Sequence, residues 1–182
     1  MSMVDCFGII RSSRARSRDR YLIPQTMVSS TTYRTAIEKM TMNHAQTVQA
    51  FFDAYSVHNV QAMLALCSPT ATFRYVQLGD IGTGSVRETA ASLWQLYMDA
   101  FPDFTTQVIS LLEGKDGTIV CETLNSGTQA KDVGNIKNKG RKMSAPHLFL
   151  FTFDSKDSIA KITAFWDNDS IYAQLGHTET HD

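Results

Sequence analysis

The sequence predicts one α+β domain, in which helices dominate the first half and antiparallel strands the second. Three observations carry this prediction. Apolar residues recur at helical spacing between residues 44 and 100, strand-like segments follow between residues 104 and 166, and no internal repeat or second domain is visible. We expect a curved, mostly antiparallel sheet that wraps over three N-terminal helices and encloses a hydrophobic, cone-shaped pocket.

The first two helices are predicted from their apolar spacing and from their ends. Residues 44–56 carry apolar side chains at i, i+3, i+4 and i+7 from Val48, and Asn43 is suited to the N-cap. A shorter helix is expected at 59–67, where Pro69 disfavours helical backbone in the residue before it.

A strand and a third helix are expected next. Residues 70–78 are rich in β-forming residues and alternate so that Phe73 and Tyr75 share one face. Ser85 and Glu88 then form the capping-box pattern that opens a helix, which we expect to end near residue 100.

The rest of the domain has the pattern of strands followed by one short helix. Strands are predicted at 104–113, 117–125, 142–153 and 159–166, and a closing helix at 170–175. Glycine-containing turns between some of these segments favour antiparallel pairing.

Composition and charge exclude several classes of protein. The chain has 182 residues, of which 43% are hydrophobic and 19% charged, and its net charge is -1, as expected of a globular protein with a substantial core. This balance favours neither nucleic acid nor a membrane surface as a partner, and no apolar run approaches the ~18 residues that span a bilayer. The three cysteines, Cys6, Cys67 and Cys121, lack the spacing of a zinc site or a disulfide framework, which fits a reducing compartment.

The charge is unevenly distributed along the chain. Residues 1–39 carry six Arg and one Lys against three acids, a net charge of +4, so the rest of the chain has a net charge of -5. We expect residues 1–41 to form an extension to a domain at 42–182. A disordered tail, or a start codon misassigned upstream of Met40 or Met42, would explain the extension, and so would a mitochondrial transit peptide. The expected location is otherwise cytoplasmic.

Two polar residues interrupt apolar faces of the predicted strands. Glu122 lies between Val120 and Leu124 on one face, and if that face lines the pocket, desolvation would raise the carboxyl pKa and make Glu122 a candidate acid/base. At an edge or mouth position it would reach water instead. His147 leads an aromatic row that continues with Phe149, where it could relay a proton or be a core histidine with one backbone partner.

The end of the last strand carries further candidates. Trp166 and Asp167 close an apolar run, so Asp167 is placed either to hold a carboxylate at a pocket mouth or to serve as a cap or turn residue. Asp169 is the stronger candidate for the N-cap of the closing helix.

Large aromatic residues are suited to the wall of the predicted pocket. Tyr55, Tyr75 and Trp94 combine apolar area with one hydrogen-bonding group, while Phe149 and Trp166 add aromatic surface. For Tyr55 and Trp94 the helical spacing is also explained by plain core packing.

Three segments carry a resemblance to a known family. They read AFPDFTTQV at 100–108, SGTQ at 126–129 and ITAFWDNDSIYAQLG at 162–176. In this order and spacing, the chain resembles the SnoaL-like polyketide cyclases of the NTF2-like superfamily over roughly residues 42–177. The resemblance implies a hydrophobic pocket in which a carboxylate acts as general acid/base in an intramolecular aldol closure, without a metal or an organic cofactor. It also implies a homodimer formed through the exposed face of the sheet.

The resemblance suggests roles for particular residues. Asp167 looks like the acid that the family often keeps before its closing helix, His147 matches the region of a pocket histidine, and Tyr55 matches a polar aromatic residue at the end of the first helix. Two positions differ from many relatives, which carry an acid near Thr163 or Ala164 and a histidine in place of Gln129.

Two classes of function follow from these observations. The first is a cofactor-free, metal-free enzyme, a cyclase or isomerase that acts on a small hydrophobic carbonyl compound by proton transfer from Asp167 or Glu122, assisted by His147 and Tyr55. The second is a non-catalytic module that binds a small ligand or dimerises, and a stress-response protein of unknown ligand is a weaker third possibility. In each case we expect no nucleic-acid or membrane partner.

Overall fold

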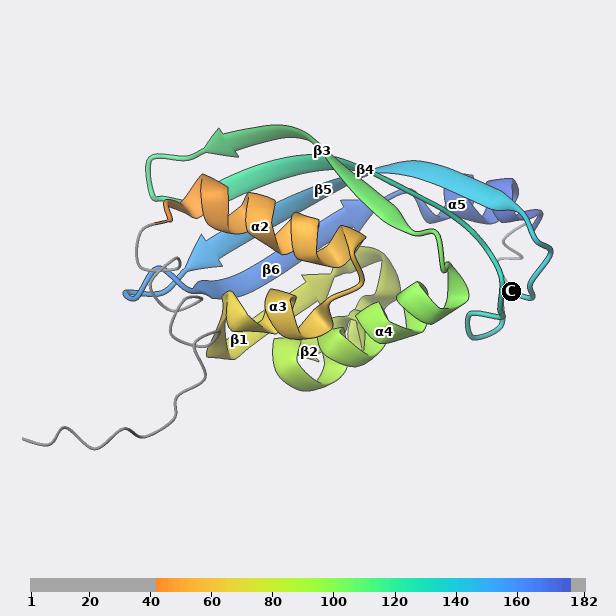
Figure 1. Ribbon diagram of the computed structural model, residues 1–182, viewed down its shortest axis with the longest axis horizontal. Coiled ribbons are helices and arrows are strands. Elements are labelled where there is room, and N and C mark those ends of the chain that lie inside the picture. The colour runs from red at the N-terminus through yellow and green to blue at the C-terminus, as the bar shows by residue number, and fades with distance from the viewer. Residues whose placement is uncertain (1–41, 178–182) are drawn as a thin grey trace, which may run out of the picture.

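Helices cover one face of a curved six-stranded sheet in the computed structural model, which describes residues 42–177 (Figure 1). The extension predicted at residues 1–41 lies outside the described residues. The α+β class and the wrapped-sheet architecture expected from the sequence are confirmed.

The elements follow the predicted order along the chain. The helices are α2 (His44–Ser56), α3 (Val60–Ala65), α4 (Ala91–Ala100) and α5 (Asn168–Leu175), with two shorter helical segments, η1 (Val76–Gly82) and η2 (Val86–Ala90). The strands are β1 (Cys67–Tyr75), β2 (Thr83–Ser85), β3 (Thr105–Glu113), β4 (Ile119–Thr128), β5 (Lys142–Phe153) and β6 (Ile159–Trp166).

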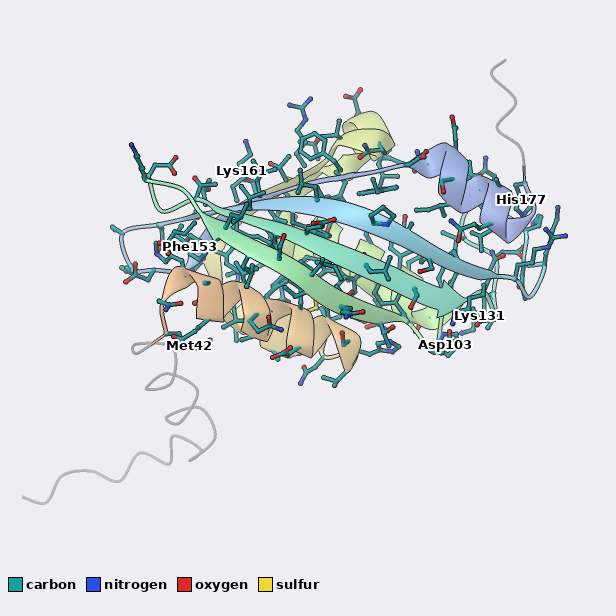
Figure 2. The ribbon with its side chains drawn as sticks, turned by 90° about the horizontal axis from the view of Figure 1, so that it is seen from above. Met42, Asp103, Lys131, Phe153, Lys161 and His177 are labelled. Carbon is teal, nitrogen blue, oxygen red and sulfur yellow. The ribbon has the colours of Figure 1, made fainter. Side chains whose placement is uncertain are left out.

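The sheet is antiparallel apart from one pair of strands. Its order is β2-β1-β6-β5-β4-β3, and the parallel pair is β1 with β6. Helices α2, α3 and α4 lie on one side of the sheet, and α2 and α5 lie at opposite ends of it (Figure 1 and Figure 2). Since the sheet curves over these helices, its inner face provides one wall of the core and, near α5, one wall of a cavity.

Helix α2 begins as the sequence predicts. The Asn43 side chain accepts a hydrogen bond from the Gln46 backbone at 2.8 Å, and the Gln46 side chain accepts one from the Asn43 backbone at 3.0 Å. This reciprocal capping box satisfies two of the backbone donors that a helix start leaves open. The capped helix buries its apolar stripe, including Val48, Phe51 and Phe52, against the sheet.

An aromatic cluster fills the core between α2, α4 and β5. The ring of Phe51 meets those of Trp94 and Phe151 edge to face, with centroids 5.5 Å apart in both pairs, and Phe52 meets Phe151 at 5.7 Å. All four side chains are at most 1% exposed. Edge-to-face pairs of this kind add to the stabilisation that burial alone provides.

Two local predictions about helix starts are wrong. Ser85 makes no side-chain cap, because the chain enters α4 through a π-helical turn at Val86–Ala90, so Glu88 is not at the third position of an α-helix. At the start of α5 the N-cap is Asp167, whose carboxylate accepts a hydrogen bond from the Ser170 backbone at 3.1 Å. Asp169 lies in the first turn instead, where a negative charge is favourable.

Within the described residues 42–177, no helix is both long enough and apolar enough to cross a membrane. The same residues contain no group of three or more His, Cys, Asp or Glu side chains arranged to hold a metal ion.

Candidate functional site

A cavity of about 90 Å³ lies between the inner face of the sheet and the helices, near α5. Among residues 42–177, no Asp, Glu, Lys or Arg side chain lines it, so its surface is apolar with a few neutral polar groups. The lining residues with a polar side-chain group are Tyr55, Tyr75, Tyr97, Asn125, His147, Trp166, Asn168 and Tyr172. Such a surface suits a small, neutral and mostly apolar ligand.

His147 is the titratable base in the cavity wall. It lies on the inner face of β5, and its ring stacks on that of Trp166 with centroids 5.3 Å apart. Its Nδ1 lies 3.1 Å from the backbone oxygen of Ala145, which can only accept a hydrogen bond, so Nδ1 carries the ring proton. Among the described residues Nε2 has no hydrogen-bond partner, which leaves its lone pair open to the cavity.

Burial keeps this imidazole neutral. Desolvation lowers the pKa of His147 from 6.5 to about 4, and the hydrogen bond to Ala145 opposes the shift only in part. At neutral pH the side chain therefore presents an unprotonated nitrogen to the cavity. A neutral imidazole can accept a proton in one step without first losing one.

Three tyrosines place hydroxyl groups around the same space. Desolvation raises the pKa of Tyr97 to about 12 and also raises the pKa values of Tyr55 and Tyr75. These groups therefore remain protonated at any physiological pH, and each can donate a hydrogen bond to a ligand oxygen. Tyr75 is held in place by Trp94, whose indole nitrogen donates to the Tyr75 hydroxyl at 2.6 Å.

Asn125 on β4 adds an amide to the cavity wall. Its side chain is 4% exposed, and its Oδ1 accepts a hydrogen bond from the Thr123 hydroxyl at 3.1 Å. Thr123 itself is fully buried beneath the cavity surface. Within residues 42–177 the amide nitrogen of Asn125 has no acceptor, so it faces the cavity as an unused donor.

The loop between β4 and β5 closes one side of the cavity. Val133 and Ile136 from this loop belong to the lining, and the buried side chain of Gln129 ties the loop together. Its amide nitrogen donates to the backbone oxygen of Ile136 at 3.2 Å, and its oxygen accepts from the Lys139 backbone at 3.4 Å. Gln129 is thus a neutral residue with a structural role in this loop.

The structure brings together most of the wall residues that the sequence suggested. Tyr55, Tyr75, His147, Phe149 and Trp166 all line the cavity. Trp94 does not, because it is fully buried, and it contacts the cavity wall through its hydrogen bond to Tyr75 and its ring contact with Tyr55.

Neither of the predicted acids reaches the cavity. Glu122 lies on the exposed outer face of β4, because it is Ile119 and Cys121 that turn inward, and its carboxylate lies 3.4 Å from the Ser110 hydroxyl. Asp167 is exposed at the start of α5, where its carboxylate is used as the N-cap. Within residues 42–177, His147 therefore faces the cavity and no carboxylate does.

Several lining residues are not evident from the sequence. Tyr97 and Tyr172 come from helices α4 and α5, and only the packing of these helices on the sheet brings them to the same space. The position of Asn125 could have been inferred from the sequence. It continues the alternation of Cys121 and Thr123 along the buried face of β4, as a polar residue near the end of the strand.

The SnoaL-like domain family is the family whose profile matches this chain, over residues 48–165. The matched segment runs from α2 into β6 and thus includes most of the cavity wall. Among curated proteins no significant match is found.

Solved structures with the same fold come from several bacteria. IdmH from Streptomyces antibioticus, a proposed polyketide cyclase, is 21% identical with a TM-score of 0.64, over 74% of this chain and 99% of IdmH. A proposed SnoaL-like polyketide cyclase from Jannaschia sp. CCS1 is 15% identical with a TM-score of 0.65, over 75% of this chain and 93% of that chain. AclR from Streptomyces galilaeus, a proposed hydroxylase, is 14% identical with a TM-score of 0.63, over 73% of this chain and 95% of AclR. At these identities the likeness concerns the fold.

Proposed function

We propose that this chain, which belongs to the SnoaL-like domain family, is a cofactor-independent enzyme. The proposed enzyme moves a proton next to the carbonyl group of a small hydrophobic compound. The observation that carries this proposal is the neutral His147, whose Nε2 faces the cavity and has no hydrogen-bond partner within residues 42–177. Cyclisation and isomerisation of carbonyl compounds both begin with such a step.

The proposed step uses groups that the cavity already contains. Nε2 of His147 takes a proton from the carbon next to the carbonyl, the electron pair of the C–H bond forms a C=C bond, and the carbonyl oxygen takes up the negative charge. Hydroxyl groups such as those of Tyr55 and Tyr97 donate hydrogen bonds toward that oxygen. The imidazolium then returns the proton to the same or another carbon. Alternatively, the enolate carbon attacks a second carbonyl group of the same molecule, the first carbonyl is restored, and the imidazolium protonates the new alkoxide.

The composition of the cavity limits the substrate. A charged group would be removed from water without an opposite charge nearby, since no Asp, Glu, Lys or Arg of residues 42–177 lines the cavity. Aromatic rings such as those of Phe149 and Trp166 instead provide apolar contact for a ring or an alkyl chain. A neutral ketone or ester with an apolar frame meets both conditions.

The test is the exchange of hydrogen for deuterium next to a carbonyl. The chain is incubated with 1-tetralone, a bicyclic aromatic ketone, in D₂O, and loss of the signal of the protons next to the carbonyl is followed by ¹H NMR. We expect the wild-type protein to accelerate exchange and His147→Gln to reduce the rate by about 10²–10⁴-fold. Equal rates with wild type, His147→Gln and no protein would refute the proposed chemistry.

A second function is favoured because no carboxylate of the described residues lies in the cavity wall. The same cavity would then bind a small neutral molecule without changing it, as a binding module of this superfamily. Binding of 1-tetralone without any exchange would support this alternative, because the ligand would occupy the cavity while the base removed no proton.

We also propose that the chain forms a homodimer through the outer face of the sheet. Leu112, Leu148 and Phe165 on this face are 65%, 41% and 37% exposed. Leu148 and Phe165 are direct neighbours on β5 and β6, so their side chains form a continuous apolar surface. A second copy can cover this surface with its own equivalent residues, as in most two-fold symmetric dimers.

Sedimentation equilibrium tests the dimer. The wild-type chain is expected to sediment as a dimer and the double variant Leu148→Lys/Phe165→Lys as a folded monomer, since two buried like charges per subunit would oppose association. Val57→Lys, which changes an exposed apolar residue at the end of α2, serves as the control. A wild-type monomer would contradict the proposal.

A further inference from the structure

We propose that Asn125 binds the carbonyl oxygen of the ligand through its amide nitrogen, and that Thr123 holds this amide in the donating orientation. The identity of the oxygen as a carbonyl rests on the function proposed above. The role of Asn125 as a hydrogen-bond donor to a ligand rests on its own contacts.

Asn125 is a polar residue on the buried face of β4. Along this face Ile119 and Cys121 pack in the core and Thr123 is buried beneath the cavity surface. Asn125 follows and lines the cavity. A buried polar side chain costs free energy unless it is hydrogen-bonded. Only one half of the Asn125 amide has a partner within residues 42–177, so the other half is available to a ligand.

Thr123 determines which half of the amide faces the cavity. The threonine hydroxyl is fully buried, and the one acceptor for its proton within residues 42–177 is Oδ1 of Asn125, at 3.1 Å. If the amide were turned round, its nitrogen would donate to the hydroxyl oxygen and the hydroxyl proton would lose its acceptor. An unsatisfied buried donor is costly, so the orientation with Oδ1 toward Thr123 and Nδ2 toward the cavity is favoured.

The strand register places this donor beside the proposed base. Thr123 pairs directly with His147, and Asn125 pairs directly with Ala145, whose backbone oxygen fixes the tautomer of His147. Asn125 and His147 are thus diagonal neighbours on one face, a separation of roughly 7–8 Å between backbones. Their side chains can therefore reach two adjacent atoms of one small ligand.

The two groups are complementary to an enolisable carbonyl. His147 offers a lone pair for the proton on carbon, and Asn125 offers an N–H for the neighbouring oxygen, which becomes negative when the proton leaves. The hydroxyl protons of Tyr55 and Tyr97 can rotate, whereas the amide protons of Asn125 lie in a fixed plane. A donor that is already oriented requires no rearrangement as the charge develops.

Binding of two matched ligands tests the donor separately from catalysis. The probes are 1-tetralone and tetralin, which have the same fused-ring frame but differ in the carbonyl group, and their affinities are measured by ligand-observed NMR. Asn125→Leu has a side chain of similar size without a donor. It should weaken binding of 1-tetralone about tenfold, the usual scale for one lost hydrogen bond, and leave binding of tetralin unchanged or tighter.

Thr123 provides a second pair of variants. Thr123→Val removes the hydroxyl while keeping the shape of the side chain, so the amide loses its orienting partner and 1-tetralone should bind several-fold more weakly. Thr123→Ser retains the hydroxyl and should bind 1-tetralone as the wild type does. This pair keeps the inference testable if Asn125→Leu fails to fold.

A vibrational measurement reports the hydrogen bond itself. The C=O stretch of bound 1-tetralone should lie at lower frequency in the wild type and in Thr123→Ser than in Asn125→Leu, because a donated hydrogen bond weakens the carbonyl bond. The inference is overturned if Asn125→Leu leaves the affinity and the stretch unchanged, if both probes lose affinity equally, or if the wild type does not bind 1-tetralone.

The exchange assay separates this inference from the proposed function. If wild type binds 1-tetralone with the shifted stretch but exchanges no protons, the donor role stands and the catalytic function fails. If His147→Gln abolishes exchange while Asn125→Leu has the wild-type rate and stretch, the catalytic function stands and the donor role fails. If the donor role of Asn125 and the catalytic function are both correct, Asn125→Leu lowers kcat for exchange and leaves the pH dependence set by His147 unchanged.

Discussion

The inner face of β5 has an imidazole at each end, and the surroundings of the two rings differ. His147 lines the cavity, with one nitrogen bonded to a backbone oxygen and the other open to the cavity. At the other end, His44 from α2 stacks on Phe153 with ring centroids 3.9 Å apart. Its two nitrogens each lie 3.1 Å from an acceptor, the backbone oxygen of Gly117 and the carboxylate of Asp157.

The difference shows that the surroundings, more than the residue type, decide what a histidine can do. Phe153 lies at the end of the sheet where α2 begins, and Asp103, Lys131 and His177 lie at the other end (Figure 2). At the first end both ring nitrogens of His44 are occupied, and the ring links α2 to two turns of the sheet. At the cavity end one nitrogen is unoccupied and desolvated, which is the condition for chemistry or ligand binding.

The largest expected effect is on the free energy of unfolding, and it differs between two phenylalanines of β5 that lie between these ends. Phe151 is fully buried against Phe51 and Phe52, so Phe151→Ala should lower the free energy of unfolding by about 3–5 kcal/mol. Phe149 lines the cavity and has fewer packed atoms on that side, so Phe149→Ala should cost less. Urea denaturation of both variants gives the comparison, and equal losses would show that the cavity end is packed as densely as the core.

The next effect is the pH dependence that His147 imposes on stability. Its folded-state pKa of about 4 lies below the ordinary value of 6.5, so the unfolded chain binds a proton first as the pH falls. Stability is therefore complete above pH 6.5, decreases between pH 6.5 and pH 4, and levels off below, a loss of about 3 kcal/mol. His147→Phe, which keeps the aromatic surface, should remove this loss when unfolding is measured across that range.

Carboxylates contribute to the pH dependence of stability in a separate pH range. Hydrogen bonds from Thr128 lower the pKa of Asp103, and those from Thr118 lower the pKa of Asp116. The stability that these groups add is present above their ordinary pKa of 3.8 and is lost as the pH falls below it, so it does not overlap with most of the histidine window. An unchanged slope between pH 6.5 and pH 4 in His147→Phe would contradict the assignment of that window to His147.

A smaller effect tests whether a charge near the cavity matters for the chemistry. Asp167 caps α5, so Asp167→Ala should lower the free energy of unfolding by about 0.5–2 kcal/mol, whereas Asp167→Asn should have little effect because Asn is an equally good N-cap. Both variants should exchange protons of 1-tetralone at the wild-type rate. Loss of exchange in Asp167→Asn, with stability retained, would instead indicate that Asp167 is the proton carrier. It would contradict the assignment of proton transfer to His147.

Much of the fold could be predicted because short-range patterns determine it. The helix at 44–56 and the strands at 142–153 and 159–166 have the bounds that periodicity predicts. The start of α4 could not be predicted in this way. The Ser85 pattern fits a capping box, but tertiary packing favours a π-helical turn, and sequence spacing does not reveal that competition.

The candidate site was predictable only where a pattern showed which side faces inward. The aromatic row behind His147 identified the inner face of β5, whereas β4 has aliphatic residues on both faces, so Glu122 was as plausible in the pocket as outside it. Aliphatic residues on the outer face, such as Leu124, form part of the surface where we propose the dimer. The contributions of Tyr97 and Tyr172 depend on how α4 and α5 pack, which no local pattern encodes.

The smallest effect completes the comparison at the other end of β5. His44→Phe keeps the stack on Phe153 but loses the contacts with Gly117 and Asp157, so the free energy of unfolding should fall by about 1 kcal/mol, as expected for partly exposed hydrogen bonds. Exchange of 1-tetralone should be unaffected, because this ring does not line the cavity. The same substitution at His147 should abolish exchange while leaving stability at neutral pH nearly intact. If His44→Phe slowed exchange as much as His147→Phe, the two ends of the sheet would be coupled, and the chemistry could not be assigned to the unpaired nitrogen alone.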